Sequence, residues 1–548
     1  MAWSHGTGTE LELSTAHRLA SGPLSQGIWM RYRIQDLHPG LGMVLGFVVG
    51  LLASPPIAAQ SVPGPEPAPA SLDSIFAQYD RTTGPGCALG VYRGGRIQYA
   101  RGYGMADLNH GLAIQPSTVF YIASTSKQFT AASVALAAES GRLNLDDPIT
   151  RHVPELPQYA DRITIRQLIQ HTSGLRDYLG LWGMSGRSFA DEIPEDVALD
   201  LITRQLAPDF PAGSRWSYSN SGYFLLSVVI KRATGMSLRE FAERNIFRPL
   251  GMTSTHFHDD NRLVVPRRAE GYQPRGGGFE IVRTSFALVG DGGLYTTIED
   301  LAKWDNNFSG NRLGGRGQGL IDELTAPGRL ASGEKHEYGF GLYSREYRGL
   351  PVIEHSGAFI GFRAQLLRFP AQRFSVAVLC NDYAADAGAL AQRVADQYLA
   401  SQLAPVAAGS QTAAVVVRPD LLGRYEGRYE VSPGQVVAIR RVGDRLQATA
   451  FGQTAALIAT SDSQFVAPPL PGQLEFRPGP TGIGLLASGI GSDLVPQLKP
   501  APALDGAALR AFAGRFVSEE LDTWATVSVV DNSLWIRARY DVWSVLEP

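Results

Sequence analysis

The order of strand-like and helix-like patterns between residues 73 and 400 constrains the fold more than any other feature of the sequence. "CALGVYRGGRIQYARGYG" (87–104) contains two alternating apolar and polar runs around Gly94-Gly95, a pattern typical of a β-hairpin. Strand-like alternation returns at 355–382, and helical patterns lie between, over 124–140, 193–206 and 221–234. Strands at both ends with helices between them predict an α+β domain: an antiparallel sheet flanked by helices.

The chain is too long, at 548 residues, for a single hydrophobic core. A small-residue stretch at 401–420 is interpreted as a linker that ends the first domain. "LLGRYEGRY" (421–429) is echoed about 90 residues later by "AFAGRFVSE" (511–519), which predicts two small antiparallel β-barrel modules, 421–504 and 505–548. Since the second module has about half the expected length, we expect it to be truncated, with unpaired edges, and to pack partly on its neighbours.

The first 60 residues have the character of a leader. "LGMVLGFVVGLLA" (41–53) is too short to span a membrane and fits the apolar region of a signal peptide, with Arg31 and Arg33 before it and a cleavage site after about Ala59. Met30 would give a signal peptide of ordinary length and is the expected true start. The proline-rich residues 61–72 then predict a linker. We therefore expect no stable membrane span and a mature protein that is periplasmic or secreted.

Composition and missing motifs exclude several function classes. A net charge of −3 and a pI of about 6.4 argue against a nucleic-acid partner. HExxH, paired CxxC and P-loop motifs are absent from the sequence, and "HFHDD" (256–260) lacks a third distant ligand, so neither a metal nor another cofactor is expected. Cys87 and Cys380 could form a disulfide in an exported chain or remain buried free thiols.

Ser124 and Lys127 are the first serine and the lysine of "STSK". They lie one helical turn apart, at the start of an apolar helical pattern. Lysine occurs at only five positions in the chain: 127, 231, 303, 335 and 499. A buried lysine can lose its proton near neutral pH, whereas arginine cannot, so this spacing is compatible with a nucleophile and its base. The alternative is a capped surface turn with a solvated lysine. A second match, Ser332 to Lys335, lies in a glycine- and charge-rich stretch and predicts a surface loop.

Two further tripeptides complete a set. "YSN" (218–220) opens a helical pattern, and "HSG" (355–357) stands at the start of a strand pattern. The set resembles the serine β-lactamase and penicillin-binding-protein superfamily, in the branch with Ser-x-x-Lys, Tyr-x-Asn and His-x-Gly motifs. The resemblance covers about 73–395, with "HTSGLRDY", "RPLGMTST" and "GDGGLYTT" as further shared segments. "STSKQFT", "SGLRDY" and the C-terminal modules are most similar to D-aminopeptidases, whose modules are lipocalin-like barrels.

The resemblance implies roles for the first two motifs. Ser124 would be the nucleophile and Lys127 its base, provided that burial or a nearby positive charge lowers the lysine pKa. Tyr218 would relay the proton to the leaving group, or serve as the base itself. Asn220 would hold a substrate amide or orient Lys127.

The third motif belongs to the substrate side of the site in this superfamily. His355 and Gly357 are expected to bind substrate, and the backbone N–H groups of Ser124 and Ala358 are expected to form the oxyanion hole. Many β-lactamases carry Lys-Thr-Gly at this position, whereas His355 is uncharged over much of the physiological range. This difference favours a peptidase or an esterase over a dedicated β-lactamase.

The resemblance and the residue types also give expectations for neighbouring positions. His171 is interpreted as a structural, hydrogen-bonded histidine, and Asp291 with its flanking glycines as a turn. In the superfamily the first and last strands of the domain are antiparallel neighbours, so Cys87 and Cys380 are expected to lie close together.

The function implied is an exported serine hydrolase that forms an acyl-enzyme on D-residue peptides, as a D-aminopeptidase or DD-carboxypeptidase. A β-lactamase-like esterase or a weak class C-type β-lactamase uses the same chemistry and remains an alternative. A penicillin-binding sensor without turnover is an alternative of another class. The expected partner is a small peptide or ester, with peptidoglycan-derived peptides among the candidates, and the sequence carries no signal for the oligomeric state.

Overall fold

The computed structural model describes residues 68–548 apart from 190, 284, 286, 406–414, 416, 433–434, 451–452, 468–472, 480–481, 488–494, 499–505, 531–532, 540–542 and 547–548. The predicted leader, with its cleavage site, lies outside the described residues. Within the described ranges, no helix combines the length and the apolar character needed to cross a membrane.

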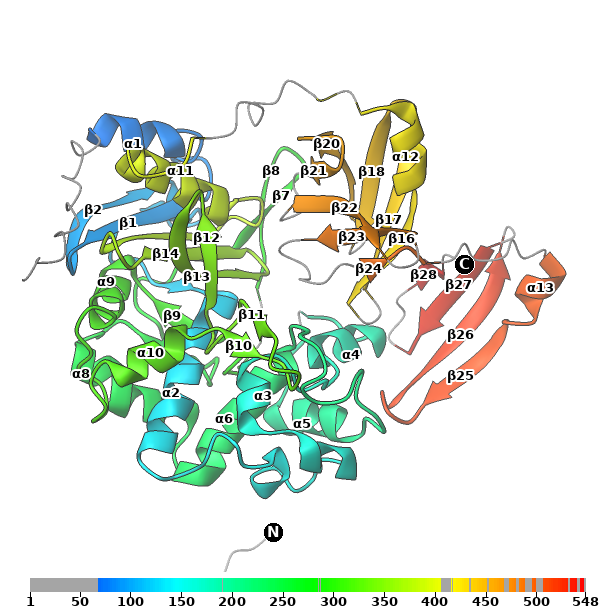
Figure 1. Ribbon diagram of the computed structural model, residues 1–548, viewed down its shortest axis with the longest axis horizontal. Helices are drawn as coiled ribbons and strands as arrows, with labels where there is room; N and C mark the ends of the chain where they lie inside the picture. Colours follow the sequence, from blue (N-terminus) through cyan, green and yellow to red (C-terminus); the bar gives the residue numbers. More distant parts are fainter. Residues whose placement is uncertain are drawn as a thin grey trace, which may run out of the picture. The chain divides into compact units, whose positions relative to one another are not determined.

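A six-stranded antiparallel sheet is the centre of the first domain, as predicted. Its strand order is β12-β13-β14-β15-β1-β2, so strands from the two ends of the domain lie side by side (Figure 1). The predicted hairpin is confirmed as β1 and β2. The strands are β1 (Cys87–Arg93), β2 (Arg96–Tyr103), β12 (Tyr343–Tyr347), β13 (Leu350–Phe359), β14 (Phe362–Phe369) and β15 (Phe374–Cys380).

Helices cover both faces of this sheet. The helices α1 (Pro69–Phe76) and α11 (Ala387–Leu399) pack on one face (Figure 1). Helix α9 (Ile298–Asn307) packs on the other face, and the side chain of Thr297 caps it by accepting a hydrogen bond from the N–H of Asp300. Each face buries its own apolar cluster, which explains why β1 and β15 are apolar along almost their whole length.

The helical part of the domain is built around α2 (Lys127–Glu139) and α6 (Asn220–Thr234). All residues of α2 from Lys127 to Ala137 are buried, so its many alanines allow neighbouring elements to approach from every side. The other helices here are α3 (Ile165–Ile169), α4 (Tyr178–Met184), α5 (Glu195–Thr203), α7 (Leu238–Ala242), α8 (Arg248–Leu250) and α10 (Gly319–Thr325). The short strands are β3 (Met105–Asp107), β4 (Leu112–Ala113), β5 (Phe120–Tyr121), β6 (His256–Phe257), β7 (Tyr272–Arg275), β8 (Gly278–Ile281), β9 (Leu294–Thr296), β10 (Gly328–Arg329) and β11 (Lys335–His336).

The two cysteines are direct register partners across β1 and β15. Cys87 and Cys380 form a disulfide, with a Cα–Cα distance of 4.0 Å. The prediction that they lie close together is confirmed, and the disulfide replaces the alternative of two free thiols.

Two predicted linkers end earlier than expected. Helix α1 begins at Pro69, inside the linker predicted for 61–72, because proline fits the first turn of a helix and Leu72, Ile75 and Phe76 are buried. Helix α12 (Pro419–Tyr425) likewise begins inside the linker predicted for 401–420 and buries Leu422. Proline-rich composition at 61–72 and small-residue composition at 401–420 therefore do not show where each linker ends.

The region 421–504 forms the first small β-module. It contains one sheet of four strands and one of five, and side chains from both sheets, such as Tyr429 and Phe476, share one buried cluster. The strands are β16 (Gly427–Ser432), β17 (Gln435–Val442), β18 (Arg445–Ala450) and β19 (Gln453–Ala456), then β20 (Ile458–Ala459), β21 (Gln464–Val466), β22 (Gln473–Gly479), β23 (Gly482–Ala487) and β24 (Val495–Pro496).

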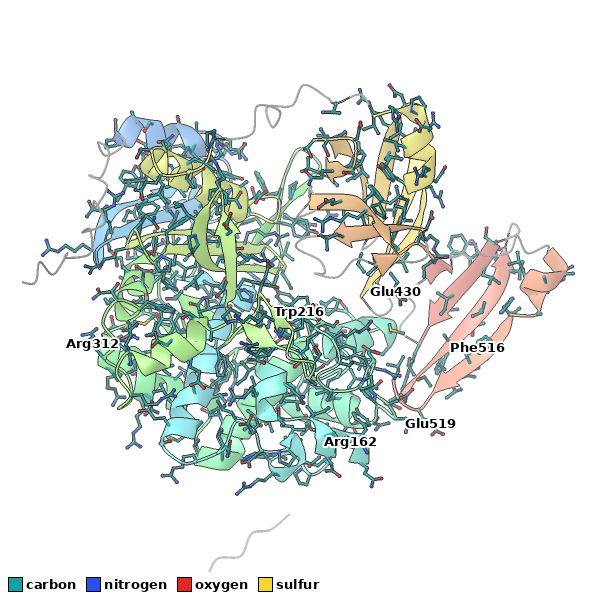
Figure 2. All side chains as sticks on the ribbon, viewed as in Figure 1. Arg162, Trp216, Arg312, Glu430, Phe516 and Glu519 are labelled. Atoms are coloured by element: carbon teal, nitrogen blue, oxygen red, sulfur yellow. A yellow bond between two sulfur atoms is a disulfide. The ribbon has the colours of Figure 1, made fainter. Side chains whose placement is uncertain are left out.

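The region 505–548 contains α13 (Gly506–Arg510) and a four-stranded antiparallel sheet. Phe516, which Figure 2 labels, and Val517 are 52% and 74% exposed. Residues at the turn between β25 and β26 contact the first domain: Glu520 pairs with Arg176 at 3.1 Å. The prediction that this region packs partly on its neighbours is confirmed. The strands are β25 (Gly514–Ser518), β26 (Thr523–Val530), β27 (Ser533–Ala538) and β28 (Trp543–Leu546).

Candidate active site

Ser124 lies on a tight turn just before α2 rather than within the helix. The turn is the 3-10 helix η1 (Ala123–Ser126), and Ala123 has a left-handed φ of 46°. Ser126 fixes this geometry, because its Oγ donates to the carbonyl of Ala123 at 2.5 Å and accepts from the N–H of Leu294 in β9 at 3.2 Å. The nucleophile predicted from sequence is thus held on a rigid turn, with its side chain partly exposed.

Lys127 is fully buried and has three hydrogen-bond partners. Its Nζ lies 3.2 Å from Ser124 Oγ, 2.9 Å from Asn220 Oδ1 and 2.6 Å from the main-chain oxygen of Asp291. The amide and carbonyl oxygens can only accept hydrogen bonds, whereas a hydroxyl can also donate. A neutral amine would therefore donate its two protons to Asn220 and Asp291 and direct its lone pair at Ser124.

The buried position also makes the neutral form accessible. Burial lowers the pKa of Lys127 to about 8, although the carboxylates of Asp291 and Asp177 act in the opposite direction. With that pKa, roughly a tenth of the lysine is neutral at pH 7. Lys127 can therefore serve as the general base for Ser124.

Tyr218 lies beside the same two groups. Its side chain interacts with Ser124, and Lys127 Nζ is 4.8 Å from the centre of its ring. Burial raises the pKa of Tyr218 well above its ordinary value, so the phenol keeps its proton near neutral pH. This favours proton relay over the role of base, which was the alternative left open by the sequence.

Asn220 is the first residue of α6, and an aspartate orients it. Oδ2 of Asp177 accepts hydrogen bonds from the backbone N–H of Asn220 at 2.5 Å and from its Nδ2 at 2.9 Å. Asp177 lies in the segment "SGLRDY", and no role was predicted for it from the sequence. Its only sequence signal was its position as a helix N-cap, before α4.

Asp291 is more than part of a turn. The flanking Gly290 and Gly293 have left-handed φ values, which confirms the predicted turn, and this turn aims the Asp291 carbonyl at Lys127. The Asp291 carboxyl group is buried and accepts a hydrogen bond from the hydroxyl of Tyr178 at 2.9 Å. Burial raises the pKa of this carboxyl group. The sequence did not predict a place in the site for the side chain of Asp291 or for that of Tyr178.

His355 lies in the middle of β13, which begins at Leu350 and not at the His-Ser-Gly motif. Its ring is buried: Nδ1 lies 2.6 Å from the carbonyl of Ser356 and Nε2 lies 3.1 Å from the hydroxyl of Tyr338. Burial, with the charge of Lys127, lowers the pKa of His355 to about 3. The His355 ring is therefore neutral, and both of its nitrogens form hydrogen bonds within the fold. Substrate binding by this side chain stays a prediction.

Gly357 has a steric reason to be glycine. A Cβ at this position would overlap the main-chain oxygen of Ile122, just before η1. The ladder between β12 and β13 ends at Glu354, so η1 contacts the following part of β13. Ala358 is exposed on this part of the strand. The structure thus brings Ser124 and Ala358 to neighbouring elements, and their oxyanion role stays a prediction.

His171 is a structural histidine, as predicted. It is buried, its Nδ1 accepts a hydrogen bond from the N–H of Ser219 at 3.2 Å, and its ring centre is 4.2 Å from that of Tyr218. Trp216, labelled in Figure 2, and Tyr338 complete an aromatic cluster around it. This cluster fixes the position of the Tyr218 ring.

Two other candidates lie outside the site. Ser332 and Lys335 are both exposed, as expected, although Lys335 begins β11 instead of lying in a loop. His256 and His258 lie 3.2 Å apart through their ring nitrogens. Among the residues that the structure describes, no group of three or more histidine, cysteine or acidic side chains is placed to hold a metal ion.

Comparison with known proteins identifies the family. The family model described as Beta-lactamase matches residues 72–399. A penicillin-binding protein of Bacillus subtilis is 28% identical over 411 residues, which cover 70% of this chain and 88% of that protein. A D-aminopeptidase of Cereibacter sphaeroides is 31% identical over 300 residues, which cover 54% of this chain and 57% of that enzyme.

The solved structures agree on the fold. The octameric penicillin-binding protein homologue from Pyrococcus abyssi has a TM-score of 0.55 and 22% identity, covering 77% of this chain and 98% of that one. The chain spans less than two thirds of the D-aminopeptidase above. Because the family model covers more than half of the chain and the Ser124–Lys127 pair is assembled in the buried geometry described above, the chain belongs to the β-lactamase family and is a serine hydrolase.

Proposed function

We propose that this hydrolase forms an acyl-enzyme on Ser124 with small D-residue peptides or amides, as a D-aminopeptidase or DD-carboxypeptidase does. The observation that carries the chemistry is the buried Lys127 Nζ, 3.2 Å from Ser124 Oγ and restricted by two acceptors on its other sides. The substrate class is supported by the relatives named D-aminopeptidase. Peptidoglycan-derived peptides, which contain D-residues, belong to this class.

In acylation, neutral Lys127 takes the proton of Ser124 as Oγ attacks the substrate carbonyl carbon. A C–O bond forms, the carbonyl electrons move to the oxygen, and the N–H groups of Ser124 and Ala358 would stabilise that charge. When the tetrahedral intermediate collapses, the C–N bond breaks and the leaving amine takes a proton from Tyr218. Lys127 then returns a proton to Tyr218, which restores both groups.

In deacylation, water replaces the amine. The same base accepts a proton from the attacking water, the ester bond to Ser124 breaks, and Ser124 regains its proton. The position of Tyr218 beside Ser124 and the contact of Lys127 Nζ with Ser124 Oγ supply a proton path for both steps.

The substrate proposal is tested by comparing five compounds on the purified protein: D-Ala and L-Ala p-nitroanilides, a D-Ala-D-Ala peptide, nitrocefin and a p-nitrophenyl ester. We expect cleavage of the D-anilide or the D-Ala-D-Ala peptide at least tenfold faster than the L-anilide, and loss of that activity in Ser124→Ala. Faster turnover of nitrocefin or of the ester than of either D-compound would contradict the D-peptide assignment. It would favour the β-lactamase or esterase alternative.

We also propose that the protein is exported. The disulfide between Cys87 and Cys380 supports this, because disulfides persist mainly in oxidising compartments. The test is the mass of the N-terminus of the protein recovered from a periplasmic fraction. We expect Gln60 as the first residue, whereas recovery of the uncleaved chain in the cytoplasm alone would contradict export.

A further inference from the structure

Asp177 uses both carboxylate oxygens, each for a different purpose. Oδ1 caps α4 by accepting from the backbone N–H groups of Leu179 at 3.0 Å and Gly180 at 3.2 Å. Oδ2 accepts from the backbone N–H of Asn220 at 2.5 Å and from its Nδ2 at 2.9 Å. An ordinary N-cap needs only the first set of contacts, so the second set requires its own explanation.

The second set determines which way the Asn220 amide points. An ionised carboxylate only accepts hydrogen bonds, so the NH₂ group of Asn220 must face Asp177 and its Oδ1 must face away. The atom that Oδ1 faces is Lys127 Nζ, at 2.9 Å. Turning the amide by 180° would place oxygen against oxygen at Asp177 and a donor against the amine of Lys127.

We propose that Asp177 is a positioning residue for the acylation step: through the amide of Asn220, it directs the lone pair of neutral Lys127 at Ser124. The inference rests on the proposed acyl-enzyme mechanism but not on the identity of the substrate. It explains why the lone pair of the Lys127 amine can point only toward Ser124.

The segment that carries Asp177 is attached to the start of α6 on both sides of the carboxylate. Ser221 Oγ donates to the carbonyl of Arg176 at 2.6 Å and accepts from the N–H of Tyr178 at 2.8 Å. Ser219 Oγ donates to the carbonyl of Leu175 at 3.1 Å. Asp177 therefore cannot move to follow a rotated Asn220, and the amide has to adopt the orientation that Asp177 imposes.

Charge and orientation predict opposite effects when Asp177 becomes asparagine. The ionisable groups around Lys127, from every element packed against it, are Asp177, Asp291, His171, His355, Tyr218 and Tyr223. Removing the Asp177 charge lowers the pKa of Lys127, which makes neutral lysine more abundant and would leave acylation at least as fast. Loss of orientation makes acylation slower even where all of Lys127 is neutral.

The experiment measures the rate of Ser124 labelling by a fluorophosphonate from pH 6 to 10 in wild type and in Asp177→Asn. In labelling, an Oγ–P bond forms, fluoride leaves and Lys127 takes the serine proton. We expect the high-pH plateau of Asp177→Asn to fall at least about 30-fold, with the midpoint of the profile at lower pH. A plateau within threefold of wild type would overturn the inference, whatever happens to thermal stability.

A matched control separates this effect from the loss of a helix cap. Asp386 caps α11 in the same way, because its Oδ1 accepts from the N–H of Ala389 at 2.8 Å, and it does not contact the site. Asp386→Asn should lower the melting temperature comparably and leave the labelling plateau within twofold of wild type. A plateau that falls equally in both variants would overturn the inference, since the loss would then follow from uncapping alone.

A second variant keeps the inference falsifiable if the first is poorly folded. In the double variant Asp177→Asn/Asn220→Asp, the carboxylate at position 220 presents an acceptor to Lys127 in either orientation. We expect its plateau to exceed that of Asp177→Asn by at least fivefold, and no recovery would overturn the inference. If the wild type itself is not labelled at Ser124, the proposed function fails with it, whereas an unaltered Asp177→Asn plateau contradicts the positioning role alone.

Discussion

The chain contains the same Ser-x-x-Lys motif twice, in two regions that differ in almost every physical respect. At Ser124 and Lys127, the lysine is 0% exposed and its Nζ lies 3.2 Å from the serine oxygen. At Ser332 and Lys335, both residues are exposed, and Ser332 Oγ accepts a hydrogen bond from the N–H of Glu334 at 3.3 Å. Residue types and spacing are thus shared, and the environment differs.

Burial and two hydrogen-bond acceptors convert the Ser-x-x-Lys spacing into a catalytic pair. Burial removes water from Lys127 and lowers its pKa to about 8, and two acceptor oxygens occupy the directions that do not face Ser124. Those oxygens belong to Asn220 and Asp291, which lie 93 and 164 positions away in the sequence. The motif supplies the two reacting groups, and distant parts of the chain supply their reactivity.

The difference between the two motifs is tested most strongly by replacing each serine in turn. Ser124→Ala should abolish fluorophosphonate labelling and reduce turnover of any acyl substrate by at least about 10⁴-fold, because no nucleophile remains. Ser332→Ala should leave both unchanged. Labelling is measured on gels, and turnover is measured in steady-state assays. Equal labelling of the Ser124→Ala protein would show that the nucleophile lies elsewhere.

The lysines can be exchanged for arginine in the same way. Lys127→Arg keeps the charge but cannot accept a proton, so kcat should fall about 10³-fold. Lys335→Arg should keep the kcat of wild type. The measurement is kcat on the best substrate of the panel above, with circular dichroism to confirm folding. If Lys127→Arg retained more than a tenth of wild-type kcat, the role of base would pass to Tyr218.

The contact between β13 and η1 can be perturbed without changing a polar group. Gly357→Ala places a Cβ against the Ile122 carbonyl, so it should lower the stability of the domain by about 1–3 kcal/mol and slow labelling. Gly180→Ala is the matched control, because an added Cβ at this exposed α4 position meets no atom within 4 Å. It should raise stability by about 0.5–1 kcal/mol. The stability of both variants is measured by thermal melts. A Gly357→Ala melting temperature at or above that of wild type would contradict the close packing.

The smallest expected effect concerns the carboxylate next to Lys127. Asp291 favours the charged lysine and so raises its pKa against the effect of burial. Asp291→Asn should therefore move the acid limb of the kcat/KM profile to lower pH, by about one unit. Asp382→Asn, another buried aspartate with a raised pKa, should leave the limb in place. An acid limb that moves to higher pH in Asp291→Asn would show that the sign of this interaction is wrong.

The parts of the fold that the sequence predicted are those encoded by neighbouring residues. The β1–β2 hairpin follows from alternation around Gly94-Gly95, and α2 and α6 follow from the helical patterns at 124–140 and 221–234. The pairing of Cys87 with Cys380 needed the resemblance to the superfamily, because the two strands lie 293 positions apart. The local sequence pattern thus predicted the helices and strands, whereas the resemblance to the superfamily predicted which strands are neighbours in the sheet.

The parts of the site that the sequence missed depend on atoms without a sequence signature. The contribution of Asp291 to Lys127 is a main-chain oxygen, which every residue has, aimed by a turn. Asp177 reads as an N-cap, and its second function appears only when Asn220 is brought against it from 43 positions away. The buried ring of His355 likewise shows its engagement with Tyr338 only in three dimensions.

The most direct test of the account is to titrate the lysines themselves. With only five in the chain, lysine-selective ¹³Cε labelling gives a spectrum simple enough to assign with the Lys127→Arg and Lys335→Arg variants. We predict that the Lys127 resonance titrates with a pKa of about 8, below the ordinary lysine value of about 10.4, and that labelling of Ser124 rises with pH along the same curve. A Lys127 resonance that titrates at the ordinary lysine pKa of about 10.4 would contradict the claim that burial makes this lysine the base.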